Sequence, residues 1–166
     1  PAIMYMIAIY TFLSFAGKYI PGFGLSKLSG LIFAYLGGIA YNMYLIKGYY
    51  DTIPDSLEEA ALIDGATRWQ TFVKIVLPLA SPILAVIVIL TFMSTFNEFI
   101  LAKIILQDVK QYTYAVGLYT FSTGPFETEW GLFTAAALIG MVPMVVLFLL
   151  MQRYIVGGLV SGAVKG

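Results

Sequence analysis

The acidic side chains of this chain offer little that could carry out covalent chemistry. Glu127 and Glu129 stand two residues apart, as a general acid and base could, but they lie in a polar stretch where solvated surface carboxylates are expected. The chain has no histidine and no cysteine, which excludes Ser–His and Cys–His nucleophiles and thiolate metal sites. The G-x-x-x-x-G-K-[ST] phosphate-binding pattern is also absent from it. The sequence therefore predicts no catalytic residue, no metal, no cofactor and no enzymatic activity of its own.

A charged segment, residues 54–78, is the most distinctive part of the chain. In chain order it contains an acidic residue followed by two alanines, then a glycine, and then two apolar residues shortly before a proline. The residues are Glu59, Ala60, Ala61, Gly65, Ile75, Leu77 and Pro78.

Two capped helices are expected within this segment. Ser56 and Glu59 form an S-x-x-E capping box that would open the first helix. Gly65 is the expected left-handed stop. Thr67 would open a second helix, with Gln70 as its reciprocal partner. The segment is thus predicted to be a helical hairpin.

The two predicted helices differ in character. The second has one apolar stripe at helical spacing, suited to packing on membrane spans or the lipid interface: Trp69, Phe72, Val73 and Val76. The first is acidic and has apolar residues on several sides, whereas a helix lying on lipid would carry Lys and Arg. A groove in a partner protein suits such a helix better. The alternative is an interfacial loop that merely connects two spans.

The elements that hold this hairpin are predicted to cross a membrane. The chain is 60% hydrophobic and 11% charged, against roughly 25% charged residues in a soluble domain. Four uncharged stretches, 1–17, 28–46, 75–97 and 131–152, are expected to be helices. A span needs about 20 apolar residues, so the first would require a few more upstream. The net charge is zero, and nothing suggests nucleic acid binding.

The remaining residues are predicted to form connections. These are a Gly- and Pro-rich turn at 18–27, the charged segment 47–74, a long loop at 98–130 and a glycine-rich tail at 153–166. The side holding 47–74 and the tail has five Lys and Arg residues against four on the other. This difference only slightly favours a cytoplasmic hairpin.

Polar residues within or beside the spans are candidates for a solute path. Asn42 lies in the second stretch and Asn97 ends the third. Glu98 follows about 23 uncharged residues, or roughly 35 Å of helix, and is expected to be a solvated carboxylate at the outer interface.

The string EAALIDGATRWQTFVKIVLP resembles the cytoplasmic EAA loop of ABC-importer permeases. Three further strings are similar to MalG-type permeases of maltose and maltodextrin importers: LIFAYLGGIAYNMYLIKGYYDTIPDSLEEAA, DVKQYTYAVGLYTF and GGLVSGAVKG. The resemblance implies an all-α membrane protein with the type I ABC-importer fold. Residues 1–166 would be a single permease domain, comprising the carboxy-terminal four of six spans.

The same resemblance implies partners and a location. They are a second, MalF-type permease, two MalK-type ATPase subunits and an extracytoplasmic sugar-binding protein, assembled in the cytoplasmic (inner) membrane. In such permeases the EAA helix sits in a cleft of the ATPase, which assigns ATPase coupling to Glu59, Ala60, Ala61, Gly65, Ile75, Leu77 and Pro78.

Two further regions receive roles from this resemblance. A tail that contacts the ATPase would contain Gly157, Gly158, Lys165 and Gly166. A loop that faces the binding protein would contain Gly124, Pro125, Phe126 and Glu127. The alternatives are an ABC permease for another solute, such as another oligosaccharide or glycerol phosphate, and a self-sufficient channel or membrane scaffold.

Overall fold

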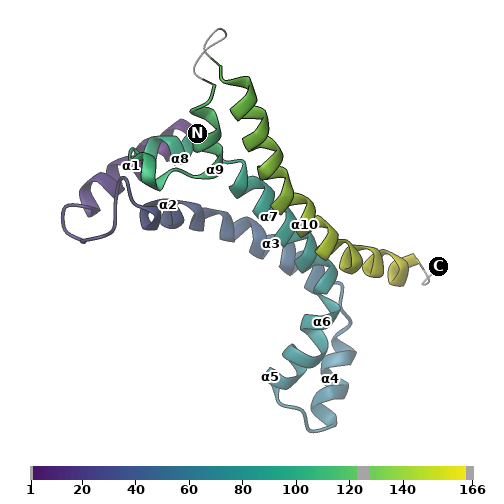
Figure 1. Ribbon diagram of the computed structural model, residues 1–166. Coiled ribbons are helices and arrows are strands. Elements are labelled where there is room, and N and C mark those ends of the chain that lie inside the picture. The colour runs from purple at the N-terminus through teal and green to yellow at the C-terminus, as the bar shows by residue number, and fades with distance from the viewer. Residues whose placement is uncertain (1, 123–127, 164–166) are drawn as a thin grey trace. The chain divides into compact units, whose positions relative to one another are not determined.

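The computed structural model describes residues 2–122 and 128–163, with side chains as far as residue 155. Every regular element in these ranges is helical (Figure 1). The α-helices are α1 (Ala2–Ala16), α2 (Leu28–Tyr35), α3 (Ile39–Tyr50), α4 (Asp55–Ile63), α5 (Arg68–Thr71), α6 (Leu77–Leu79), α7 (Ser81–Phe96), α8 (Ile100–Ile105), α9 (Tyr114–Tyr119) and α10 (Trp130–Ala163). The short 3-10 helices are η1 (Leu36–Gly38) and η3 (Val109–Gln111), and η2 (Phe72–Val76) is a π-helical turn.

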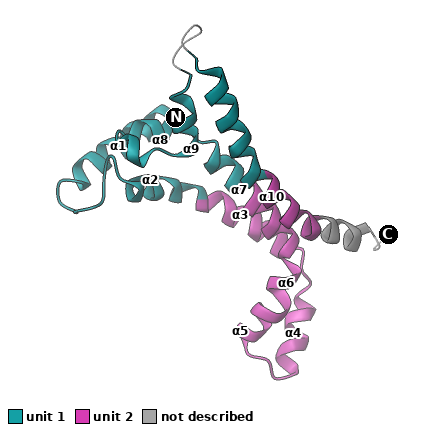
Figure 2. Ribbon diagram, in the orientation of Figure 1, with its two compact units in different colours: residues 1–38, 92–144 teal, residues 39–91, 145–166 magenta. Residues whose placement is uncertain are grey.

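The chain forms two compact units (Figure 2). Unit 1 comprises residues 1–38 and 92–144, and unit 2 comprises residues 39–91 and 145–166. Each unit is therefore built from two separate stretches of sequence.

Two helices in the described residues are long and apolar enough to cross a membrane, Leu28–Tyr50 and Trp130–Ile155. They confirm the predicted spans at 28–46 and 131–152. The pair Arg68–Leu79 and Ser81–Phe96 can count as a third span, although it is bent by 69°. The predicted span at 75–97 is thus broken rather than continuous. Ala2–Ala16 is apolar but shorter than a span.

The core of unit 1 is built around α8. Its buried residues come from four helices and the residue after α8: Leu13, Leu31, Ala34, Leu101, Ala102, Ile105, Leu106 and Val116. Half of these belong to residues 101–106. The prediction that 98–130 is simply a loop is therefore wrong, because this segment folds inward as α8 and α9 and supplies much of the apolar core.

The turn at 18–27 is confirmed, and a glycine contact closes it. Gly24 has φ +122°, and a Cβ on it would stand 2.7 Å from the Cα of Gly17. A side chain there would separate the two backbones, so glycine is needed at this position.

The predicted glycine-rich tail is helical as far as it is described. Helix α10 continues from the membrane-spanning stretch through Gly157 and Gly158 to Ala163. Backbone hydrogen bonding along one uninterrupted helix has overridden the weak helix propensity of glycine. Lys165 and Gly166 lie outside the described residues.

Candidate functional site

The hairpin of unit 2, residues 54–80, begins differently from the prediction. Helix α4 starts at Asp55, its N-cap is Pro54 with φ −64° and ψ 130°, and no side chain caps it. The predicted Ser56–Glu59 capping box is wrong, since Ser56 lies inside the helix. Pro54 holds the extended approach, and its carbonyl accepts a hydrogen bond from the Leu57 N–H at 3.1 Å. Asp55 and Glu58 then place negative charge in the first turn, where the helix dipole favours it.

The end of α4 explains why two of the motif residues are small. Gly65 has φ +84°, which confirms the predicted left-handed stop. The Ala66 N–H donates to the Ala61 carbonyl at 3.0 Å, and the Gly65 N–H donates to the Leu62 carbonyl at 3.1 Å. These two bonds make a Schellman motif, which sets Ala61 close to Ala66. Ala61 is buried there, so a larger side chain would open the turn.

The second helix of the hairpin starts as predicted. The Thr67 hydroxyl accepts from the Gln70 N–H at 3.2 Å, and the Gln70 side chain accepts from the Thr67 N–H at 2.8 Å. This reciprocal pair confirms the capping box.

A π-helical turn then interrupts the second helix. The Leu77 N–H donates to the Phe72 carbonyl, five residues back, instead of four. Pro78 follows directly; it has no N–H, and its ring would clash with the carbonyl four residues before it, that of Lys74. The wider turn of η2 accommodates this proline.

The hairpin joins α7 through an elbow at Ala80, a residue that is 0% exposed. Pro78 and Pro82 flank it, and the helices on either side are bent by 69°. Both prolines therefore lie where the chain changes direction.

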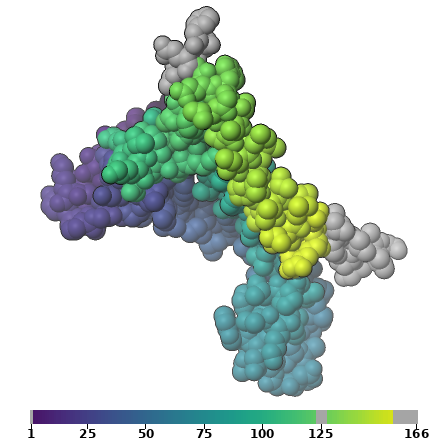
Figure 3. Space-filling model, viewed as in Figure 1, coloured from purple at the N-terminus to yellow at the C-terminus, as the bar shows by residue number. Residues whose placement is uncertain are grey.

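The outer surface of the hairpin combines apolar and acidic groups. Ile63 is 85% exposed, Trp69 is 71% exposed, and Leu57 and Leu62 are also exposed. Within the described residues, the carboxylate of Glu59 makes no hydrogen bond or ion pair. The space-filling view shows the hairpin as a lobe whose visible faces are not covered by other parts of unit 2 (Figure 3).

The predicted apolar stripe of the second helix does not form a single buried face. Val76 and Thr71 are buried, whereas Trp69 and Val73 remain exposed. Val73 lies within the π-helical turn, which departs from the 3.6-residue period. Trp69 instead packs against Phe72, with ring centroids 5.7 Å apart.

The remaining motif residues lie near the elbow. Ile75 and Leu77 are half-buried, and Pro78 is exposed. Glu59 and Ala60 are exposed on α4. The structure thus places all the predicted coupling residues on one hairpin, between α4 and the elbow.

Two asparagines predicted to line a solute path make hydrogen bonds within the chain. The Asn42 side chain donates to the Thr91 hydroxyl at 3.1 Å, joining α3 to α7. The Asn97 side chain donates to the Met93 carbonyl of its own helix at 2.8 Å. A role in a solute path stays a prediction for both. The predicted binding-protein loop, Gly124, Pro125, Phe126 and Glu127, lies outside the described residues.

Sequence reasoning missed one contact at the elbow. The hydroxyl of Tyr49, at the end of α3, donates a hydrogen bond to the Leu79 carbonyl at 3.0 Å. The only sequence signal was a tyrosine near the end of an apolar stretch, which is also typical of a residue at the membrane interface.

Comparison with known proteins identifies the family. The model of the family "Binding-protein-dependent transport system inner membrane component" matches residues 1–160. The chain belongs to this family.

This inner membrane component is also similar to curated proteins along its whole length. It is 49% identical to the maltose/maltodextrin transport system permease protein MalG of Vibrio vulnificus (strain YJ016) over 166 residues, which is 100% of the chain and 56% of the relative. It is 48% identical to the proteins of that name from Yersinia pestis and Escherichia coli (strain K12), covering 100% of the chain and 54% and 56% of those relatives. The chain therefore spans about half the length of the curated relatives it matches.

Proposed function

We propose that this chain is part of the permease subunit of an ATP-driven importer of maltose or maltodextrins. The similarity to proteins named maltose/maltodextrin permeases extends over the whole chain at 48–49% identity. A second permease of the MalF type would complete the translocation path, and an extracytoplasmic binding protein would deliver the sugar. Alternating access of the path would follow from movement of one half against the other.

The energy for this movement must enter through a contact with ATPase subunits of the MalK type. These 166 residues contain no phosphate-binding loop, so ATP hydrolysis is assigned to those partners. We assign the contact to α4. Its ends are rigidly defined, by Pro54 at the start and by Gly65 at the close.

The observation that carries this assignment is the surface of α4. A lipid headgroup surface would favour Lys and Arg, and α4 (DSLEEAALI) has neither. Exposed Leu57, Leu62 and Ile63 beside exposed acids suit a groove that has an apolar floor and basic walls. Helix-in-groove binding also fits a small residue, Ala60, on the exposed surface in the middle of the helix.

Charge reversal within the hairpin tests the assignment. In the assembled transporter, Glu59→Lys is expected to abolish sugar-stimulated ATP hydrolysis and to reduce uptake of labelled maltose severely, because it places a cation against basic groove walls. Gln107→Lys adds the same side chain at an exposed position of unit 1 and should leave both activities unchanged. Wild-type coupling in Glu59→Lys would contradict the assignment.

The solute requires a separate experiment. Proteoliposomes that contain the transporter and its binding protein are expected to take up maltose and maltotriose, with ATP, and not glycerol phosphate. Uptake of glycerol phosphate alone would favour a permease for another solute. Uptake without ATP or partner subunits would favour a self-sufficient channel.

A further inference from the structure

The hydrogen bond between Tyr49 and the elbow links two segments that are 30 residues apart in sequence. Leu79 is the last residue of α6, directly before the buried Ala80. Carbonyls at the end of a helical segment lose their regular partners. Tyr49 supplies a donor to one of them at 3.0 Å, so this bond depends on the bend of the elbow.

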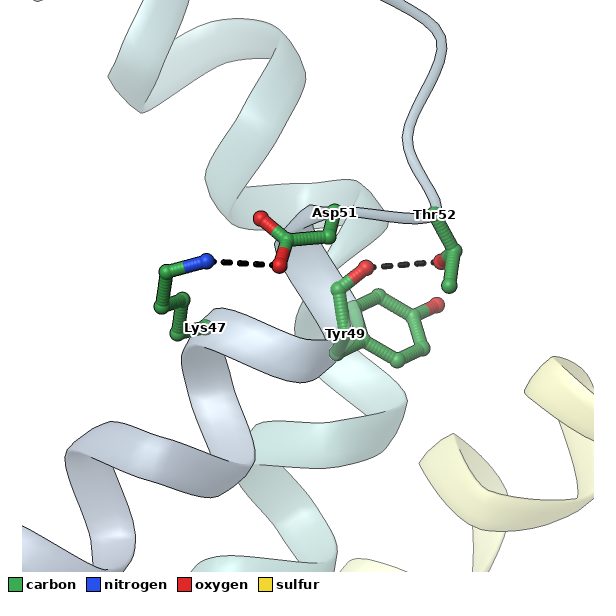
Figure 4. A network of polar contacts seen from close by, with 4 residues as sticks. All are labelled: Lys47, Tyr49, Asp51 and Thr52. Carbon is green, nitrogen blue, oxygen red and sulfur yellow. Dashed lines mark hydrogen bonds and ion pairs between the residues drawn. The ribbon is translucent and has the colours of Figure 1, made fainter.

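The position of Tyr49 is itself well defined by contacts at the end of α3. The Thr52 hydroxyl donates to the Tyr49 carbonyl at 2.6 Å, and Lys47 pairs with Asp51 at 2.7 Å (Figure 4). The hydrogen bond from the Thr52 hydroxyl satisfies the Tyr49 carbonyl, which lies at the helix end where regular partners are missing. Tyr49 is therefore held on a helix end of fixed geometry rather than in a loop.

A second hydrogen bond links α3 to α7. Asn42 precedes Tyr49 by seven residues, or about two helical turns, and so lies on the same face of α3. Its side chain donates to Thr91 of α7 at 3.1 Å. Thr91 follows Leu79 by twelve residues, so α3 and α7 run antiparallel. The Asn42 bond ties α3 to α7, and the Tyr49 bond ties α3 to α6 at the elbow.

The two ties have a mechanical consequence for the hairpin. A change of angle at the elbow would carry the Leu79 carbonyl away from the Tyr49 hydroxyl. The hairpin can keep this bond only by moving together with α3 and α7. Loss of the bond would leave the Leu79 carbonyl without this donor, which is unfavourable for a carbonyl at the end of a helical segment.

We propose that Tyr49 is a positioning residue of the energy-coupling step: its hydroxyl holds the hairpin at a fixed angle to α3, so that displacement of α4 moves α3 and α7 as one body. This inference rests on the proposed docking of the hairpin to an ATPase. Asn42 and Thr91 provide the second tie of the same body. Without the Tyr49 bond, part of the movement of α4 would be absorbed by bending at Ala80.

Tyr49→Phe in the assembled transporter tests the proposal, because it removes only the hydroxyl. Sugar uptake per ATP hydrolysed is expected to fall about threefold, in line with the average strength of a hydrogen bond between membrane helices. The ATPase subunits should still copurify. Tyr44→Phe is the matched control, because Tyr44 lies on the same helix and is 75% exposed. Its sugar uptake per ATP hydrolysed should equal that of the wild type.

Three different results would contradict the role of Tyr49, and one of them would also contradict the proposed function. A wild-type ratio in Tyr49→Phe, with ATPase bound, overturns the role of Tyr49 and leaves docking intact. A lower unfolding midpoint with uptake and ATP hydrolysis reduced in parallel shows a purely structural residue and also overturns it. Failure of the wild-type chain to retain any ATPase overturns the proposed function, and the role of Tyr49 with it.

Discussion

Carboxylates are used in opposite ways in the two units. In unit 1, Glu98 is half-buried and accepts three hydrogen bonds: from the Leu101 N–H at 2.7 Å, the Ala102 N–H at 2.9 Å and the Tyr35 hydroxyl at 2.9 Å. In unit 2, Glu59 is exposed on α4, and no described residue donates to it. One acid holds the fold together, and the other remains available to a partner.

This difference shows how to tell a structural acid from a candidate docking acid. Glu98 was expected to be a solvated carboxylate at the outer interface; its solvated character is wrong, whereas its place at the interface stays a prediction. It caps the first turn of α8, whose residues fill the core of unit 1. Glu59, in contrast, is exposed and makes no hydrogen bond or ion pair within the described residues.

Glu98→Ala should have the largest effect on stability. It leaves two N–H groups of α8 and the Tyr35 hydroxyl without their acceptor, and the expected loss is about 3 kcal/mol in the free energy of unfolding. Denaturant unfolding of the complete subunit in detergent would measure it. Unchanged stability would show that the capping bonds are dispensable and would remove the contrast between the two acids.

Tyr35→Phe should have an intermediate effect. It removes one of the three donors to Glu98 and keeps the aromatic packing, so a loss of about 1 kcal/mol is expected. The double variant with Glu98→Ala should cost less than the sum of the two single changes, since the residues share a bond. Full additivity would argue against a direct interaction.

Glu59→Ala should have the smallest effect on stability, within about 0.5 kcal/mol, as for a surface residue without a partner. Coupling of ATP hydrolysis to transport should nevertheless be impaired. A loss of stability comparable to that of Glu98→Ala would mean that Glu59 serves the fold of the hairpin instead.

Local signals predicted much of the fold. Uncharged stretches long enough to span a membrane became helices at 28–46 and 131–152, because backbone groups in lipid must be paired within the helix. Gly65 and the Thr67–Gln70 pair were recognisable because a left-handed stop and a capping box involve residues only a few positions apart.

Interactions between distant residues could not be predicted in the same way. Glu98 is 63 residues from Tyr35, and Tyr49 is 30 residues from Leu79. The helical spacing of the apolar residues in 69–76 also does not predict the π-helical turn, because that turn depends on Pro78 as well as on the residues within it. The predicted coupling residues were brought together on one hairpin, but their role in coupling stays a prediction.

Chemical labelling at Ile63 tests docking of the hairpin most directly. These 166 residues contain no cysteine, so Ile63→Cys introduces one thiol into them, at a position that is 85% exposed. Val109→Cys, at a 73% exposed position of unit 1, is the control. The labelled peptides can be quantified by mass spectrometry in the permease with and without its ATPase subunits.

Docking of α4 into a groove predicts that the thiol at position 63 reacts rapidly in the permease alone and is protected several-fold once the ATPase subunits are bound. The thiol at position 109 should react equally in both preparations. Equal labelling at position 63 with and without bound ATPase would contradict the central claim.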